Sequence, residues 1–120
     1  MNSRDLRDLD LRGVDFRNAD LRESNFSGAN LGGADMRGAN LAQADLPTVD
    51  MSQADLRGTN FEGANLTWSI MVGADLTGAN LAGAKLGGAD LSGANLAGAI
   101  LDGARLCKTK LPTGMDNSNC

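Results

Sequence analysis

Residues 74–98 read ADLTGANLAGAKLGGADLSGANLAG and contain one five-residue unit five times in succession. Continuing this frame in both directions, every fifth residue from Leu6 to Leu111 is Leu, Phe or Met, without a break. The residue two positions earlier is most often Ala, and the residue directly before is most often Asp or Asn. Gly stands two positions after the large apolar residue in most units, which gives the consensus A[D/N]LxG. A repeat at fixed spacing over almost the whole chain predicts a solenoid.

The period of five excludes the two common regular structures. In an amphipathic helix, successive large residues would be about 500° apart and would form no apolar stripe. In a continuous strand they would alternate between opposite faces. A short extended segment fits better, with Ala and Leu pointing inward, the Asp or Asn pointing outward, and Gly at a corner. Winding this unit gives an all-β solenoid with one small and one large side chain per side in its interior.

Composition narrows the classes of function. The chain has 120 residues, a formal net charge of −4, one Trp, no Tyr and no His. An acidic balance disfavours direct nucleic-acid binding, and the lack of a long apolar run argues against membrane insertion. Without His, and with no Ser, Cys or Lys beside an identifiable base, we expect no catalytic residue, no metal site and no cofactor. We therefore expect that the protein is not an enzyme.

The A[D/N]LxG units resemble those of the pentapeptide repeat family, and the resemblance covers residues 4–113 in one frame. That family folds as a right-handed quadrilateral β-helix (β-solenoid) with four pentapeptides per coil. The resemblance therefore implies about five and a half coils for this chain. We expect a short N-terminal lead at residues 1–3, the β-helix at 4–113 and a C-terminal capping tail at 114–120.

With four units per coil, residues 20 apart stack into ladders on the outer surface. One such side carries four aspartates beside three arginines: Asp15, Asp35, Asp55, Asp75, Arg17, Arg37 and Arg57. In one interpretation these are solvated charges that compensate one another. In the other, the arginines form a stripe that binds a carboxylate or phosphate partner. We favour compensation, because an Asp accompanies each Arg and cancels its field.

The most irregular units surround the single Trp. Trp68 takes the corner position that Gly holds elsewhere, Ile70 replaces the outward Asp or Asn, and Val72 also points outward. We predict that these three residues form an exposed apolar patch with a polar rim, which is typical of a protein-binding surface. The alternative is that Trp68 packs over its own corner and that Ile70 and Val72 are ordinary exposed residues.

The two ends of the solenoid expose coil edges, and we expect them to be covered in different ways. Only residues 1–3 precede the repeat, so either a capping segment has been removed or the first coil stacks on a partner. We accordingly expect a monomer, or a dimer formed by end stacking of the N-terminal coil. The last residues leave the repeat with turn-forming chemistry, which is typical of a cap.

The two cysteines, Cys107 and Cys120, both lie near the C-terminal end, where a tail returning over the last coil would bring them together. The segment CKTKLPTGMDNSNC also resembles the tail of some cyanobacterial and plastid pentapeptide repeat proteins. A disulfide between them would imply an oxidising compartment such as the thylakoid lumen or periplasm. The alternative is two reduced thiols in a cytoplasmic protein.

Three functions follow as hypotheses. The first is a non-catalytic scaffold that binds another protein through Trp68, Ile70 and Val72. The second, suggested by the family resemblance, is a DNA-mimicking modulator of a DNA topoisomerase such as gyrase, in which the Asp ladder imitates phosphates. Against it, residues 112–120 contain no dimerisation module of the kind such members carry. The third is a structural role through stacking of the N-terminal coil.

Overall fold

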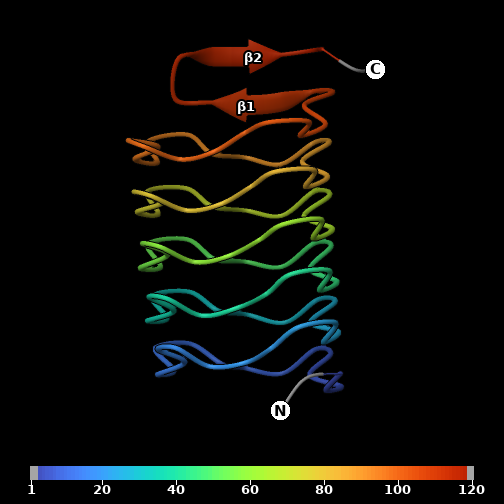
Figure 1. Ribbon diagram of the computed structural model, residues 1–120, viewed down its shortest axis with the longest axis vertical. Coiled ribbons are helices and arrows are strands. Elements are labelled where there is room, and N and C mark those ends of the chain that lie inside the picture. Colours follow the sequence, from blue (N-terminus) through green and yellow to red (C-terminus); the bar gives the residue numbers. More distant parts are fainter. Residues whose placement is uncertain (1–2, 119–120) are drawn as a thin grey trace.

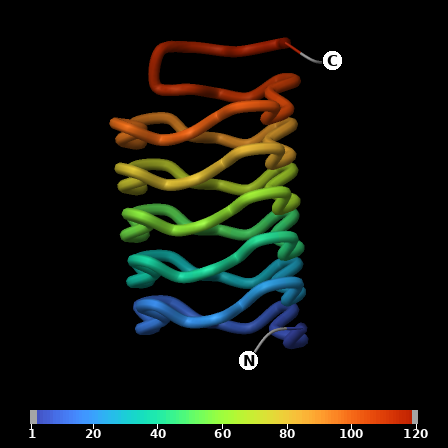
Figure 2. Tube along the Cα trace, in the orientation of Figure 1, coloured from blue at the N-terminus to red at the C-terminus, as the bar shows by residue number. Residues whose placement is uncertain are grey.

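The computed structural model describes residues 3–118 as a stack of coils along one axis (Figure 1). The coils follow one another in sequence order, with the two ends of the chain at opposite ends of the stack (Figure 2). The principal extents are 34 × 22 × 21 Å. Residues 3–118 contain no helix, and therefore none that is long and apolar enough to span a membrane. The expected all-β solenoid is confirmed.

Successive coils are joined by parallel β-bridges between residues 20 positions apart, such as Asp55 and Asp75. Around this bridge the Leu56 N–H donates to the Asp75 carbonyl at 2.8 Å, and the Asp75 N–H donates to the Ala54 carbonyl at 3.1 Å. The same pattern recurs from the first coil to the last. Residues 20 apart therefore form ladders, as the sequence analysis predicted.

The corners of the coil are tight turns that favour glycine. The Ala19 N–H donates to the Phe16 carbonyl at 3.1 Å, three residues earlier, and this bond recurs at most corners. The third residue of such a turn has a positive φ, for example 69° at Gly78, which glycine adopts without a steric penalty. Trp68 takes the same conformation with a φ of 60°. It therefore occupies a glycine-type corner, as predicted.

The interior consists of the large central residues and the small residues two positions before them. Both are fully buried through most of the stack, whereas end residues such as Leu6 and Leu106 are partly buried. Phe16 and Phe26 meet edge to face with ring centroids 6.4 Å apart. Burial of these side chains, together with the backbone bonds between coils, holds the stack together.

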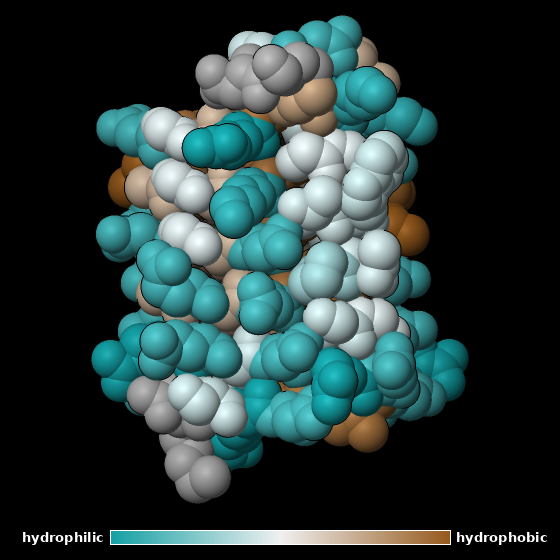
Figure 3. All heavy atoms as spheres, turned by 90° about the vertical axis from the view of Figure 1, so that its right-hand side faces the viewer, coloured by the Kyte–Doolittle hydropathy of each residue, from teal (hydrophilic) through white to brown (hydrophobic). Residues whose placement is uncertain are grey.

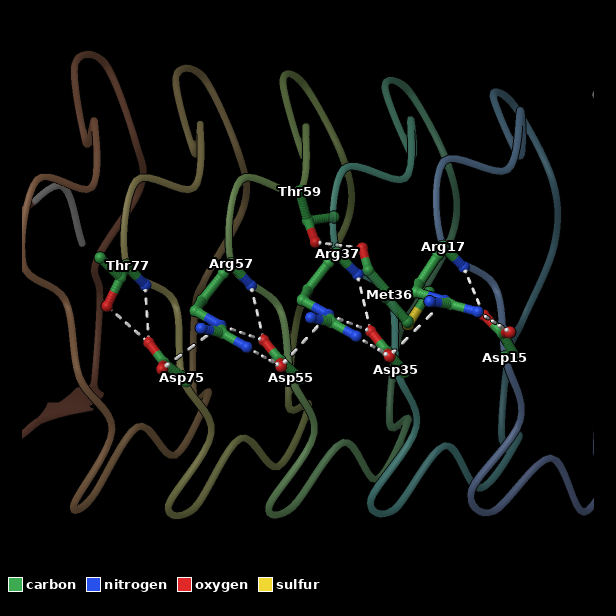
Figure 4. Close-up of polar contacts among 10 residues, drawn as sticks. All are labelled: Asp15, Arg17, Asp35, Met36, Arg37, Asp55, Arg57, Thr59, Asp75 and Thr77. Carbon is green, nitrogen blue, oxygen red and sulfur yellow. Dashed lines mark hydrogen bonds and ion pairs between the residues drawn. The ribbon is translucent and has the colours of Figure 1, made fainter.

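Polar residues enter the interior at the small position in four units: Ser24, Thr59, Ser69 and Thr109. The Thr59 hydroxyl donates to the Met36 carbonyl of the preceding coil at 2.8 Å (Figure 4). The Thr109 hydroxyl donates in the same way to the Leu86 carbonyl at 2.7 Å. Ser69 Oγ is buried and has no hydrogen-bond partner among the described residues.

The outward Asp and Asn side chains bind the backbone at the start of the corner. Asn80 Oδ1 accepts a hydrogen bond from the Ala82 N–H at 3.0 Å, and Asp50 Oδ1 accepts one from the Ser52 N–H at 2.9 Å. A short side chain with an acceptor two residues upstream of an N–H is the geometry of an Asx turn. This explains why the position before the central residue is usually Asp or Asn.

The chain leaves the repeat through a β-hairpin that lies on the last coil (Figure 1). Strand β1 (Thr109–Leu111) pairs antiparallel with strand β2 (Gly114–Asp116), and the register places Lys110 opposite Met115. Pro112 and Thr113 form the connecting turn, and proline is common in such turns. The hairpin brings the chain back across the C-terminal end of the stack.

Candidate functional site

A groove of about 530 Å³ lies at the corner of the solenoid that carries Trp68, and extends to the C-terminal hairpin. Five large apolar side chains are exposed among residues 3–118, and three of them line this groove. These are Trp68 at 59% exposure, Met115 at 55% and Ile70 at 42%. The other two, Leu9 and Ile100, lie elsewhere. The groove is therefore the main exposed apolar surface of the described chain.

The floor of the groove is built by a corner column, in which Trp68, Gly88 and Lys108 stack at a spacing of 20 residues. The Trp68 N–H donates to the Gly87 carbonyl and the Gly88 N–H to the Cys107 carbonyl, each at 2.9 Å. A methyl group on Gly88 would overlap the indole ring of Trp68. Because Gly88 has no side chain, the indole lies across it and a depression remains between Trp68 and Lys108.

One wall of the groove is a ladder of three outward-pointing residues in successive coils. Parallel β-bridges join Ile70 to Asp90 and Asp90 to Lys110. The hairpin register places Met115 directly opposite Lys110, so the two side chains are on the same face of the hairpin. The apolar groups thus come from two segments that are 45 residues apart in sequence, Ile70 on a coil and Met115 on β2.

The charged groups of the groove are two lysines and one aspartate. The Asp90 carboxylate accepts hydrogen bonds from the Ser92 hydroxyl at 2.6 Å and the Ser92 N–H at 3.0 Å. These bonds, with a smaller contribution from the charge of Lys110, lower the pKa of Asp90. Neither Lys108 nor Lys110 forms an ion pair with a carboxylate in the described part of the chain. The groove therefore carries excess positive charge.

The predicted apolar patch is only partly brought together. Trp68 and Ile70 line the groove, whereas Val72 is half-buried and does not line it. Sequence reasoning missed Gly88 and Met115. The spacing of 20 residues was sufficient to place Gly88 beside Trp68, and the Pro112–Gly114 turn was the signal for a hairpin that returns Met115 to this corner.

The predicted electrostatic ladder forms a continuous chain of ion pairs (Figure 4). Each arginine pairs with the aspartate two residues earlier, for example Arg37 with Asp35 through two nitrogen–oxygen contacts at 2.9 and 2.6 Å. Each also approaches the aspartate of the next coil, as Arg37 Nε does Asp55 Oδ2 at 3.5 Å. The residues joined in this way are Asp15, Arg17, Asp35, Arg37, Asp55, Arg57 and Asp75.

These contacts stabilise the charged forms of the ladder. Hydrogen bonds from the Arg17 side chain and then from its backbone N–H lower the pKa of Asp15 to about 2. The pKa of Asp55 is lowered by the Arg57 side chain in the same way. For Asp75, the Thr77 hydroxyl and N–H are the larger causes, and the Arg57 charge adds to them. Ion-paired side chains of this kind give a polar exterior with little net field.

Away from the groove, most exposed side chains of residues 3–118 are polar. On the face in Figure 3, hydrophilic side chains run in columns parallel to the long axis, and hydrophobic residues show mainly at the margins. Beyond the ladder, three further arginines pair with the aspartate two residues earlier: Arg7 with Asp5, Arg12 with Asp10, and Arg22 with Asp20. Against this background the groove at Trp68 is the distinctive feature of the surface.

Two further expectations concern cysteines and metals. Cys120 lies outside the described residues, so the Cys107–Cys120 disulfide stays a prediction. No group of three or more His, Cys, Asp or Glu residues within 3–118 is placed to hold a metal ion.

The family model described as Pentapeptide repeats (8 copies) matches residues 5–38, 34–73 and 74–111. The chain belongs to the pentapeptide repeat family, and its fold is a right-handed β-helix of that family. The resemblance seen in the sequence is thereby confirmed. A comparison with curated protein sequences finds no match.

Several solved structures are similar. A pentapeptide repeat protein from the thylakoid lumen of Arabidopsis thaliana is 29% identical, with a TM-score of 0.67 over 88% of this chain and 70% of that one. Rfr23, from the cyanobacterium Cyanothece 51142, is 28% identical with a TM-score of 0.47, covering 90% of this chain and 85% of that one. QnrB1, a plasmid-mediated fluoroquinolone resistance protein, is 17% identical with a TM-score of 0.47, covering 88% and 81%.

Proposed function

We propose that this protein is a non-catalytic scaffold that binds another protein through the groove at Trp68 and Ile70. The observation that carries the proposal is the concentration of exposed large apolar side chains there, with Met115 as a third member. Binding hot spots are enriched in Trp and lie in pockets that a partner can desolvate. The rigid coils fix the positions of Trp68 and Ile70, which reduces the entropy lost on binding.

Capture from a lysate of the source organism tests this function, with bound proteins identified by mass spectrometry. The informative variants are Trp68→Gly and Ile70→Asn. Gly is the residue that most units carry at the corner, and Asn is one of the two residues, with Asp, that most units carry before the central residue, so both changes preserve the coil. Ile100→Asn is the matched control, since Ile100 is also exposed at an Asp/Asn position but lies outside the groove. A partner captured by the wild type and by Ile100→Asn, but lost from both groove variants, supports the function. Equal capture by all four contradicts it.

The topoisomerase alternative has less support. A DNA mimic must present uncompensated negative charge along its surface. The Asp15–Asp75 ladder has an arginine between each pair of aspartates, so its field is largely cancelled. A gyrase supercoiling assay tests this alternative directly, and inhibition or protection at micromolar protein would revive it.

For the architecture, we propose the quadrilateral form with about five and a half coils of four pentapeptides. The parallel bridges at a spacing of 20 residues support four units per coil. We also propose the division into a lead at residues 1–3, the β-helix at 4–113 and a cap at 114–120. The start of β2 at Gly114 supports the last boundary.

For the compartment, we propose that Cys107 and Cys120 are bridged and that the protein works in an oxidising environment such as the thylakoid lumen. The thylakoid-lumen origin of the Arabidopsis protein supports this. The test is a free-thiol count on denatured, unreduced protein together with light scattering. A monomer without free thiols agrees with the proposal. Two thiols per chain contradict it, and a dimer would favour end stacking.

A further inference from the structure

We propose that the groove binds an extended acidic peptide segment whose apolar side chain lies between Trp68, Ile70 and Met115, and whose carboxylates pair with Lys108 and Lys110. This inference rests on the proposed protein-binding function and specifies the chemistry of the partner. Charge complementarity between the groove and an acidic segment favours this partner.

The basic residues of the chain divide into those that form ion pairs and those that do not. In the part of the chain that the structure describes, six arginines form ion pairs with aspartates, and all six lie between Arg7 and Arg57. Among the described residues, no ion pair involves the remaining five basic residues. These are Arg4, Lys85, Arg105, Lys108 and Lys110.

Most of the unpaired basic residues lie close to the groove. Lys108 and Lys110 line the groove, and Lys85 and Arg105 are bridged to one another on the side of the coil that precedes the Lys108 corner. Arg105 is three residues before Lys108, so their Cα atoms are at most about 11 Å apart. Four of the five unpaired cations thus gather around one corner, whereas Arg4 lies in the first coil, where its carbonyl accepts the Asn25 N–H.

Apolar and positively charged side chains follow one another along the groove. In the corner column Gly88 separates Trp68 from Lys108, and in the wall ladder Asp90 separates Ile70 from Lys110. Both columns therefore run from an apolar residue to a lysine in the same direction. A segment lying along the two columns meets Trp68 and Ile70 first and then the ammonium groups of Lys108 and Lys110, with Met115 of β2 opposite Lys110. An apolar residue next to Asp or Glu matches this order.

The competing ligands are less well matched. The chain carries a net charge of −4, and a nucleic-acid or anionic-lipid surface much larger than the groove would also face the surrounding carboxylates. Among residues 3–118, no aromatic side chain other than Trp68 lines the groove, whereas single-stranded nucleic acid needs successive stacking platforms. A short acidic peptide contacts the cations at the corner and avoids the acidic surface elsewhere.

The experiment is selection of a random linear peptide library, displayed on phage, against the immobilised full chain. A parallel selection against Trp68→Gly removes peptides that bind outside the groove. We expect enriched peptides with Asp or Glu beside an apolar residue. Their synthetic forms should bind Lys110→Glu about tenfold more weakly than the wild type, since reversing a charge in contact with a carboxylate replaces attraction by repulsion. Arg4→Glu is the control, because it makes the same change in net charge far from the groove.

The remaining outcomes separate the two claims. Peptides that require Trp68 but lack acidic residues and bind Lys110→Glu normally would overturn the acidic partner while leaving the protein-binding function intact. Identical selections on wild type and Trp68→Gly would overturn both. Titration of a single-stranded oligonucleotide and of anionic phospholipid vesicles completes the test. Binding of either that is lost in Lys110→Glu, without enrichment of acidic peptides, would assign the groove to that ligand and contradict the proposal.

Discussion

The indole of Trp68 lies directly over the Cα of Gly88 in the next coil, in the space that a side chain at position 88 would fill. Trp68 itself takes a left-handed backbone conformation, with a φ of 60°, that is unfavourable for a bulky residue. The left-handed corner at Trp68 and the absence of a side chain at Gly88 together set the position of the exposed indole. This arrangement leaves the opening between Trp68 and Lys108.

Gly88→Ala should displace the indole and destabilise the protein. Gly88 has a φ of 71°, so Ala there costs about 1–2 kcal/mol from the left-handed backbone alone, and displacement of Trp68 adds to this loss. Because Trp68 is the only Trp, its fluorescence reports the change directly. Chemical denaturation and the emission spectrum measure the two effects.

The matched control for that prediction is Gly78→Ala. Gly78 has a φ of 69° and no atom within 4 Å of the position of an added Cβ. The Gly78→Ala variant should lose about the same 1–2 kcal/mol of stability, because Ala takes the same left-handed backbone conformation, and its emission spectrum should be unchanged. A spectrum that moves equally in both variants, or in neither, would contradict the contact between Trp68 and residue 88.

Removing the buried hydroxyl of Thr59 and that of Ser69 should have different effects on stability. Thr59→Val loses a hydrogen bond to the Met36 carbonyl and should destabilise the protein by about 1 kcal/mol. Val fits this position, since Val49 is fully buried at an equivalent one. Ser69→Ala removes a hydroxyl without a partner among the described residues, so its effect should be neutral or stabilising. Comparable losses in both variants, measured by urea denaturation, would show that Ser69 Oγ is hydrogen-bonded in solution.

The repeat made most of the fold predictable. A five-residue period that fits neither helix nor strand fixes which residues point inward, and burial at Leu56 or Ala54 follows from it. The pairing of Asp35 with Arg37 was also predictable, because residues two apart on an extended segment share a face. These features depend on local spacing alone.

The groove could be predicted only in part, because it depends on contacts between segments that do not share the repeat. Trp68 and Ile70 stood out as departures from the consensus. Met115 joins them only through the antiparallel register of β1 and β2, which a single Pro–Thr turn sets. Lys110 was visible as a substitution for Asp or Asn, but its role at the groove required the positions of both Asp90 and the hairpin.

A truncation in the interior should be costly in the middle of the stack and milder near its end. Leu56 is fully buried, and Leu56→Ala should lower the free energy of unfolding by about 2–5 kcal/mol. Removal of the side-chain methyl groups creates a cavity that the stacked coils cannot close by moving together. Leu101 is only partly buried, so Leu101→Ala should cost less. Differential scanning calorimetry of both variants checks the order. A larger loss at Leu101 would contradict the position of the core.

The Asp–Arg ladder should make stability fall in acid. The pKa of Asp15 is lowered to about 2 from 3.8 by the Arg17 hydrogen bonds, and those of Asp35 and Asp55 are lowered in the same way. A carboxylate whose pKa is lower in the folded than in the unfolded protein contributes stability above the unfolded value. That contribution is lost as pH falls from about 4 through 2.

Replacing Arg17, Arg37 and Arg57 together by Gln should lower stability at pH 7, where four aspartates then face one another. It should also flatten the acid dependence between about pH 4 and 2, because the pKa values of those aspartates return toward their ordinary range. Arg4→Gln, which removes an unpaired arginine, should leave the slope unchanged. Urea denaturation at a series of pH values measures the slope, and a triple variant with the slope of the wild type would show that the ladder pairs do not persist in solution.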